Sequence, residues 1–336
     1  MVKVLVVGCG SIGKRHARLL DERPEVEVWV CDALRSNLQG ALEQAPGAKS
    51  YSDYQQALGD RPDAVFVCVP NHLHAPMAVA ALQAGCDVLC EKPLADSVEH
   101  AEAIAEAAEV SMGMLQVGYS LRSHAGLRRV QELVATGDCG TLVGGRAMVG
   151  TYFTLMCATT PYRMTEENAL ITDYTHLLDY LRLLFGDLKR VSAESATLGD
   201  LEMRPQPNLF SLLLKYESGA VAQCHLDYIQ HPQRHTLELY GDRQTIVYDF
   251  QIGQLQVFDR DRVGCYTEFV TVARDDIYRV QIEEFLTRRA TSRVPLVSAE
   301  DGVAALRAAH AAVEAARTGT AVNVNGGRRG GGPPPP

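Results

Sequence analysis

Residues 2–20 read VKVLVVGCGSIGKRHARLL, and this stretch decides the fold of the first half of the chain. The apolar run before Gly8 predicts a buried β-strand, and the residues from Lys14 onward predict a helix. Between them, Gly8, Gly10 and Gly13 form the pattern G-x-G-x-x-G. Glycines at these positions allow a tight turn, so that a pyrophosphate can bind the N–H groups at the positive end of the helix. We therefore expect a dinucleotide site that contains Gly8, Gly10, Ser11, Ile12 and Gly13.

The next apolar strand bears on which dinucleotide binds. It runs from Val26 to Cys31 and ends at Asp32, where an acidic side chain accepts hydrogen bonds from the adenosine ribose. Its carboxylate would repel a 2′-phosphate, which favours NAD over NADP. Arg35 follows closely and could bind a 2′-phosphate, or it could be a solvated arginine at a helix start, so NADP stays an alternative.

Composition limits the classes of protein and partner. The 336 residues suit two domains, and a net charge of −9 with scattered lysines and arginines gives no basic stripe for nucleic acid. A small-molecule partner fits better. No apolar stretch reaches the length of a membrane span, and a strand that starts at residue 2 leaves no room for a signal peptide, so we expect a cytoplasmic protein. The nine cysteines contain no C-x-x-C pair and predict buried, reduced thiols with no metal site.

The order of the elements predicts two different domains. Up to residue 119, short apolar strands alternate with amphipathic helices, which indicates βαβ units and a doubly wound parallel sheet. From 190 to 273, strands follow one another with hairpin signals such as Glu217-Ser218-Gly219. We expect an α/β Rossmann domain over 1–120, an α+β domain with a large, mostly antiparallel sheet over 121–324, and a disordered Gly/Pro tail over 325–336. An open sheet face of this kind predicts a homodimer or homotetramer.

A short motif stands at the end of the strand that covers residues 87–90. It reads Glu91-Lys92-Pro93. A lysine at the carboxyl end of a parallel strand faces the crevice where open α/β sheets bind ligands, so the ammonium group of Lys92 can contact a bound substrate. Taken alone, the motif would favour a lysine that opens a surface helix.

The chain resembles the Gfo/Idh/MocA (glucose–fructose oxidoreductase / inositol dehydrogenase) family along nearly its whole length. The motifs that carry the resemblance are Gly8–Gly13 with His16, Pro70-Asn71-His72-Leu73-His74, Glu91-Lys92-Pro93, Gly118-Tyr119-Ser120-Leu121-Arg122, and Asp173-Tyr174-Thr175-His176 followed by Asp179. The resemblance implies an NAD(P)-dependent oxidoreductase that interconverts a ring hydroxyl and a ketone of a sugar, cyclitol or sugar derivative.

The resemblance also implies roles for individual residues. Lys92 would hydrogen-bond the reacting oxygen, His176 would exchange its proton, and Asp173 would orient the site. Chemistry favours the same roles, because an alcohol that loses hydride must also lose a proton, and histidine titrates nearest to neutral pH. Asp173 and His176 fall within one predicted helix, Asp173–Phe185, so we expect them to share a face. Helix caps or surface contacts are the alternative for both.

Further candidates follow from the motifs. The resemblance assigns cofactor contacts to Pro70, Asn71, His74, Glu91 and Lys92. Arg122, Tyr162 and Arg163 could bind substrate, or they could form structural ion pairs. His16 is interpreted as structural.

The chain departs from the family pattern around its predicted catalytic helix. In many relatives the aspartate precedes the histidine by four positions and glycines come before it, whereas here Thr172 and Glu167-Asn168-Ala169 stand there. The loop 152–168 matches little, so the identity of the substrate does not transfer. A reductase of a non-sugar substrate, of dihydrodiol or pigment type, and a non-catalytic NAD(P)/sugar-sensing regulatory protein remain alternatives. The presence of both Lys92 and His176 favours the dehydrogenase.

Overall fold

The computed structural model describes residues 1–152, 167–200 and 206–324 and divides the chain into two compact units. The first unit combines Met1–Arg128 with Val272–Leu306, and the second contains Arg129–Thr271 and the chain from Arg307 onward. The sequence predicted that the chain passes from the first domain to the second once, near residue 120. The chain instead returns to the first unit after the large sheet, because Ile282 and Phe285 are buried in a core cluster of the first unit. The predicted tail, 325–336, lies outside the described residues.

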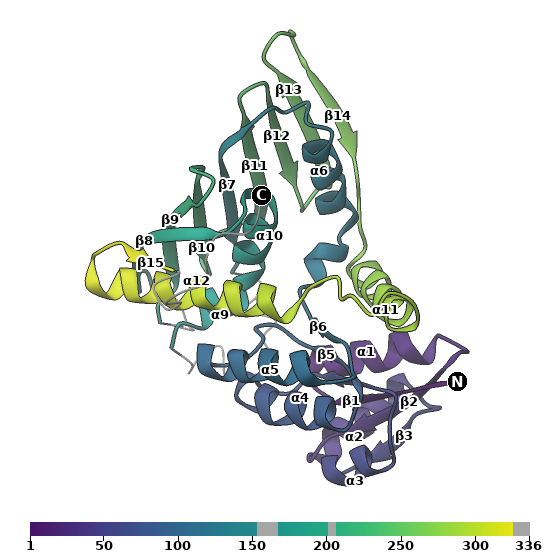
Figure 1. The fold of residues 1–336 in the computed structure, drawn as a ribbon. Helices are drawn as coiled ribbons and strands as arrows, with labels where there is room; N and C mark the ends of the chain where they lie inside the picture. The colour runs from purple at the N-terminus through teal and green to yellow at the C-terminus, as the bar shows by residue number, and fades with distance from the viewer. Residues whose placement is uncertain (153–166, 201–205, 325–336) are drawn as a thin grey trace. The chain divides into compact units, whose positions relative to one another are not determined.

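The first unit is built on a six-stranded sheet in which all neighbouring strands are parallel, in the order β3-β2-β1-β4-β5-β6 (Figure 1). The strands are β1 Val2–Val7, β2 Val26–Cys31, β3 Lys49–Tyr51, β4 Ala64–Val67, β5 Asp87–Cys90 and β6 Leu115–Val117. The strand order reverses between β1 and β4, and ligands of such sheets bind outside the carboxyl ends of the strands at this point. The predicted Rossmann sheet is confirmed.

Helices cover both faces of this sheet. They are α1 Ser11–Asp21, α2 Arg35–Gln44, α3 Tyr54–Gly59, α4 His74–Gln83, α5 Val98–Val110 and α11 Arg274–Ala290, with short 3₁₀ turns η1 Asn71–Leu73 and η2 Ser120–Ser123. Successive side chains of β1 enter different cores: Val4 and Val6 pack with α1, α2 and α11, whereas Leu5 and Val7 pack with α3, α4 and α5. This alternation is why the strands are apolar throughout.

The second unit contains a nine-stranded sheet in the order β14-β13-β12-β11-β7-β10-β9-β8-β15. Its strands are β7 Leu142–Gly150, β8 Leu188–Ala196, β9 Leu209–Tyr216, β10 Val221–Asp227, β11 Arg234–Gly241, β12 Gln244–Asp249, β13 Gln254–Asp259, β14 Cys265–Phe269 and β15 Val322–Asn323. Within this sheet, β7 and β10 pair in parallel and the other described pairs are antiparallel, so the mostly antiparallel sheet is confirmed. The predicted hairpin joins β9 to β10, with Gly219 at φ +93.

Four helices complete the described chain: α6 Ala125–Ala135, α9 Ala169–Asp173, α10 Thr175–Phe185 and α12 Ala299–Thr318. α9 and α10 pack on the sheet at β7, β9 and β10 (Figure 1). Ala222, Cys224 and Leu226 of β10 are buried on that side, whereas the alternate residues Val221 and Gln223 are exposed. The sheet therefore has one packed face and one exposed face within this unit.

The structure corrects the predicted helix Asp173–Phe185. Asp173 ends α9, Thr175 begins α10, and Tyr174 between them leaves the helical conformation with φ −104 and ψ 23. The N–H of Leu177 then bonds to the carbonyl of Tyr174 in a new turn. Asp173 and His176 therefore lie on different helices, and the expectation that they share one helical face is wrong.

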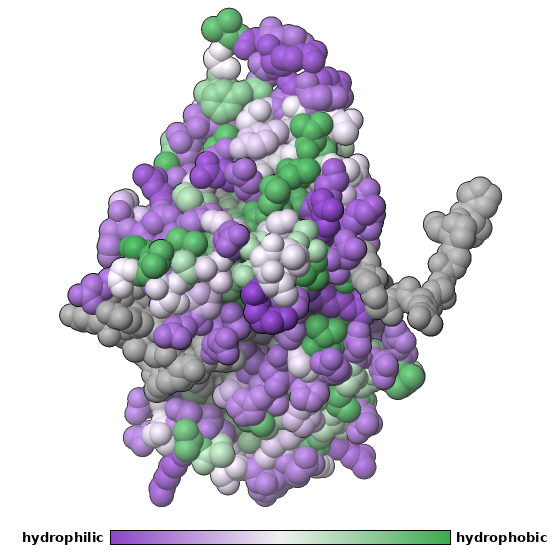
Figure 2. Space-filling view, turned by 90° about the vertical axis from the view of Figure 1, so that its left-hand side faces the viewer, coloured by the Kyte–Doolittle hydropathy of each residue, from purple (hydrophilic) through white to green (hydrophobic). Residues whose placement is uncertain are grey.

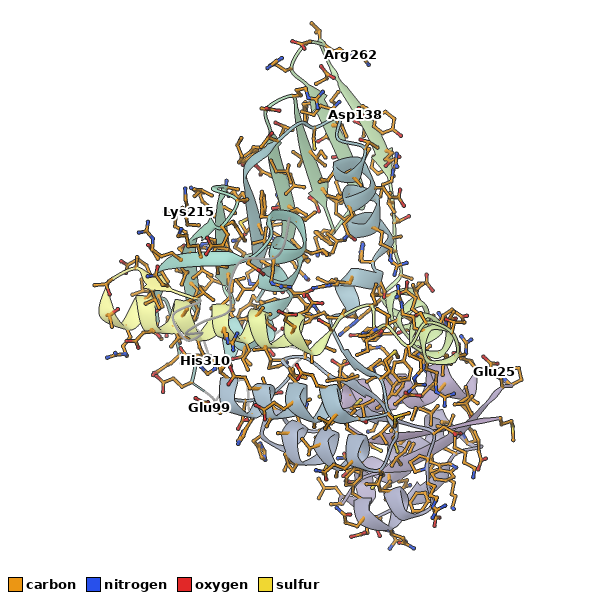
Figure 3. The ribbon with its side chains drawn as sticks, viewed as in Figure 1. Glu25, Glu99, Asp138, Lys215, Arg262 and His310 are labelled. Carbon is orange, nitrogen blue, oxygen red and sulfur yellow. The ribbon has the colours of Figure 1, made fainter. Side chains whose placement is uncertain are left out.

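Charged side chains lie at turns and at the ends of elements. Figure 3 shows Glu25 in the turn before β2, Asp138 in the turn before β7 and Arg262 in the hairpin between β13 and β14. Hydrophilic residues predominate on the face seen in Figure 2, with apolar residues interspersed. Among the described helices, none has both the length and the apolar character needed to span a membrane.

Candidate active site

The glycine turn joins β1 to α1 in a shape that requires glycine. Gly8 has φ +88, and a Cβ at this position would lie 2.6 Å from the carbonyl oxygen of Cys68. A Cβ at Gly13 would lie 1.8 Å from the carbonyl oxygen of Gly8. Within the described chain, α1 has no side-chain cap and no acidic residue in its first turn, and the space beside Gly10 is open. The amino end of α1 therefore fits the pyrophosphate of a dinucleotide.

Asp32 is held beside this turn by three hydrogen bonds. Its carboxylate accepts the backbone N–H groups of Cys9 at 2.8 Å and Leu34 at 2.7 Å, and the side-chain amide of Asn37 at 3.1 Å. The carboxylate thus has a fixed orientation at the end of β2, where a ribose hydroxyl would meet it. Arg35 is the first residue of α2 and is exposed.

The segment after β4 contains the predicted cofactor residues Pro70, Asn71 and His74. Pro70 is exposed and Asn71 is half-buried at the start of η1. His74 is buried, with its Nδ1 2.9 Å from the carbonyl oxygen of Pro93 and its Nε2 2.9 Å from that of Val69. Burial lowers the pKa of this imidazole. Both ring nitrogens thus face backbone carbonyls, so His74 joins two loops, and its contact with the cofactor stays a prediction.

Lys92 follows β5 at the carboxyl edge of the parallel sheet and is half-buried. The neighbouring Glu91 is buried, with one carboxylate oxygen 3.1 Å from Nε2 of His16. Its other oxygen accepts the backbone N–H of Lys92 at 3.3 Å. Lys92 therefore stands where the sequence placed it, on a backbone that is tied to a buried carboxylate.

Arg122 is buried and pairs with Asp301. Its Nη1 lies 3.1 Å from Oδ2 of Asp301, which also accepts the backbone N–H of Ser298 at 3.0 Å. Of the two alternatives for Arg122, the structure shows the structural ion pair, and substrate binding stays a prediction. Tyr162 and Arg163 lie outside the described residues.

In the second unit, Asp173 is bound by a tyrosine that the sequence did not indicate. The hydroxyl of Tyr228 donates to Oδ2 of Asp173 at 2.8 Å, and both residues are buried. Tyr228 directly follows β10, whereas Asp173 ends α9. His176 is half-buried in the first turn of α10. The carboxylate of Asp173 is thus bound by a residue that directly follows a strand of the large sheet.

The thiols around the glycine turn are unsuited to nucleophilic chemistry. Burial, with the charge of Asp32 as the second cause, raises the pKa of Cys9 to about 12, and the same two causes raise that of Cys31 to about 11. A thiol of such high pKa stays protonated near neutral pH and is a poor nucleophile. Within the described ranges, no group of three or more His, Cys, Asp or Glu side chains is arranged to hold a metal ion.

Three residues that hydrogen-bond predicted site residues were not predicted from the sequence in this role. They are Asn37, which holds Asp32; His16, which contacts Glu91; and Tyr228, which contacts Asp173. His16 belongs to the glycine-turn motif, and that signal alone could have pointed to it. Nothing in the local sequence around Asn37 or Tyr228 distinguishes either residue from an ordinary polar residue.

Comparison with known proteins agrees with this geometry. Residues 2–119 match an oxidoreductase family with an NAD-binding Rossmann fold, and residues 127–247 match the GFO/IDH/MocA C-terminal domain. The chain belongs to the GFO/IDH/MocA family. The predicted resemblance and the predicted NAD-binding fold are confirmed.

Relatives with assigned names differ in how much of the chain they cover. An inositol 2-dehydrogenase of Salmonella typhimurium is 36% identical over 152 residues, which are 43% of this chain and 45% of that protein, so the chain spans less than half of that relative's length. An inositol 2-dehydrogenase of Pseudarthrobacter chlorophenolicus is 26% identical over 96% of both chains. A 1,5-anhydro-D-fructose reductase of Ensifer adhaerens is 26% identical over 83% of this chain and 85% of its own.

Solved structures share the fold over almost the whole chain. An oxidoreductase from Agrobacterium radiobacter in complex with NAD+, L-tartaric acid and magnesium has a TM-score of 0.88 at 19% identity, covering 96% of this chain and 98% of its own. Levoglucosan dehydrogenase in complex with NADH has a TM-score of 0.86 at 21% identity, covering 96% and 99%. At this level of identity the likeness establishes the fold.

Proposed function

We propose that this protein is an NAD-dependent dehydrogenase that interconverts a ring hydroxyl and a ketone of a sugar, cyclitol or sugar derivative. The observation that carries the proposal is the position of Lys92 at the carboxyl edge of the parallel sheet, the edge at which the glycine turn and Asp32 fit a dinucleotide. The names of the relatives support the substrate class, because inositol and 1,5-anhydro-D-fructose are both polyhydroxylated rings.

The proposed mechanism divides the transfer of hydride and proton between different groups. Bound NAD supplies the acceptor for the hydride. The ammonium group of Lys92 donates a hydrogen bond to the carbinol oxygen and stabilises the negative charge that develops there. His176 accepts the hydroxyl proton in oxidation and returns it in reduction. Asp173, held by Tyr228, presents a fixed carboxylate that orients the hydroxyl groups of the ring.

The preference for NAD follows from the fixed carboxylate of Asp32. Two backbone N–H groups and Asn37 hold it in place, so it cannot turn aside for a 2′-phosphate without losing these bonds. Arg35 is exposed and begins α2, which leaves NADP as the alternative cofactor.

A substrate panel tests the proposed function. Cyclitols, hexoses, nucleotide sugars and a dihydrodiol are each mixed with purified protein and NAD or NADP, and the absorbance of the reduced cofactor is followed. We expect turnover with at least one polyhydroxylated ring. Tight binding of NADH without turnover on any member of the panel would instead favour a regulatory protein, and turnover of a dihydrodiol alone would favour the non-sugar reductase.

A further inference from the structure

The contact between His16 and Glu91 is buried inside the first unit and lies next to the proposed catalytic lysine. The side chain of His16 is fully buried, and its Nε2 is 3.1 Å from Oε1 of Glu91. Its ring packs edge-on against Phe66 and Tyr278, with ring centres 5.2 Å and 5.5 Å apart. Neither the substrate nor the cofactor can reach such a ring, so any effect on the reaction must pass through Glu91.

The surroundings of the ring fix the position of its proton. Nδ1 of His16 finds no hydrogen-bond partner among the described residues. A proton on Nδ1 would be a buried N–H without an acceptor, which folded proteins avoid more strictly than an unpaired acceptor. The proton therefore belongs on Nε2, which donates to Glu91.

Glu91 connects this histidine to the backbone of Lys92. Its Oε1 faces His16, and its Oε2 accepts the N–H of Lys92 at 3.3 Å. Its own N–H donates to the carbonyl of Val67 at 3.0 Å. Gly118 packs against it so closely that a Cβ there would lie 2.9 Å from its Cα and 3.1 Å from its Oε2. The carboxylate is thus confined by two hydrogen bonds and by Gly118, and His16 is its side-chain donor.

We propose that His16 is a positioning residue for Lys92: its Nε2–H fixes the Glu91 carboxylate, which in turn fixes the peptide group that carries Lys92. The inference rests on the proposed function, in which Lys92 binds the reacting oxygen. It also connects the two halves of the site within the first unit, because His16 lies in α1, the helix whose amino end fits the pyrophosphate.

Two substitutions separate the hydrogen bond from the packing. His16→Phe keeps an aromatic ring between Phe66 and Tyr278 but removes the donor. His16→Gln places an amide N–H near the position of Nε2. We expect His16→Phe to lower kcat by roughly tenfold to a hundredfold, the range that a small misplacement of a catalytic group produces, with the Kd of NADH changed less than about twofold. His16→Gln should recover most of the rate. Equal kcat values for the wild type and His16→Phe would overturn the proposal.

Hydrogen exchange gives a readout that does not require turnover. With the donor removed, amide exchange in residues 91–94 should speed up in His16→Phe and return toward the wild-type rate in His16→Gln. Glu91→Gln should speed up exchange to a similar extent, and the double variant should add little if both act through one contact. Unchanged exchange in both His16→Phe and Glu91→Gln would contradict the proposal even if no substrate were found, so its failure is distinct from a failure of the proposed function.

Nitrogen NMR tests the position of the proton directly. In protein labelled with ¹⁵N-histidine, the signals lost in His16→Gln identify His16. We expect a protonated Nε2 and an unprotonated Nδ1 in the wild type. A proton on Nδ1, or on both nitrogens, would overturn the assignment.

Discussion

Replacement of Tyr228 by phenylalanine removes one hydroxyl group from the candidate site and leaves its ring in place. That hydroxyl donates to Oδ2 of Asp173 at 2.8 Å, with both residues buried. A hydrogen bond to a charged group contributes about 1.5–3 kcal/mol to stability. Water cannot readily replace the lost donor at a buried carboxylate, so we expect the free energy of unfolding to fall by about this amount.

The stability change should be visible as a shift in the melting temperature. For a domain of 150–250 residues, 1 kcal/mol corresponds to about 2–4 °C, so Tyr228→Phe should lower the Tm of the transition that unfolds the second unit by about 3–12 °C. Differential scanning calorimetry measures this shift. If Asp173 orients the substrate, kcat should fall as well, because the carboxylate gains freedom to turn.

Tyr240→Phe provides a matched control. The hydroxyl of Tyr240 also donates to a carboxylate, that of Glu238, but at an exposed position on β11. Exposed interactions of charged groups contribute about 0–1 kcal/mol, so this substitution should change the Tm by only a few degrees at most. Equal Tm values for Tyr228→Phe, Tyr240→Phe and the wild type would refute the reasoning that burial makes the contact with Asp173 strong.

Four further outcomes are expected. His176→Ala should lower kcat by roughly 10²–10⁴ with NADH affinity unchanged, and its effect should be far less than additive with that of Lys92→Met; wild-type rates in His176→Ala would contradict the proposed proton transfer. Calorimetric titration should show tighter binding of NAD(H) than NADP(H), with a smaller gap in Asp32→Ala; a tenfold preference for NADP(H), about 1.4 kcal/mol, would reverse the prediction. Light scattering should give the mass of at least two chains because the large sheet has an exposed face, whereas a concentration-independent monomer at micromolar protein would disprove it. Burial lowers the pKa of His124 from 6.5 to about 4, so the unfolded chain binds more protons between these values and stability should fall as pH drops from 6.5 to 4; His124→Asn should flatten this dependence in melts recorded across that range.

The sequence by itself determined the features that depend on neighbouring residues. The glycine turn could be predicted because the positive φ of Gly8 and the close approach of the Gly8 carbonyl to Gly13 exclude other residues at these positions. The parallel sheet follows from short apolar strands that alternate with helices, and the antiparallel sheet follows from successive strands joined by turns such as that at Gly219. Asp32 and Lys92 were located because they stand one and two residues after strands whose ends could be predicted.

The tertiary structure decided which distant residues meet. His16 and Glu91 are 75 residues apart, Asp173 and Tyr228 are 55 apart, and Arg122 and Asp301 are 179 apart. Such pairs form because packed helices and strands bring them together, and the local pattern around each residue carries no sign of its partner.

Local sequence also failed to predict the break of the helix at Tyr174 and the return of the chain to the first unit. No glycine or proline marks the break at Tyr174, so the periodic pattern from 173 to 185 predicted one helix where there are two. The packing of Ile282 and Phe285 shows that α11 belongs to the first unit, although it follows the large sheet in the sequence. Hydrophobic periodicity specifies that a face is covered, whereas the shape of the folded chain specifies what covers it.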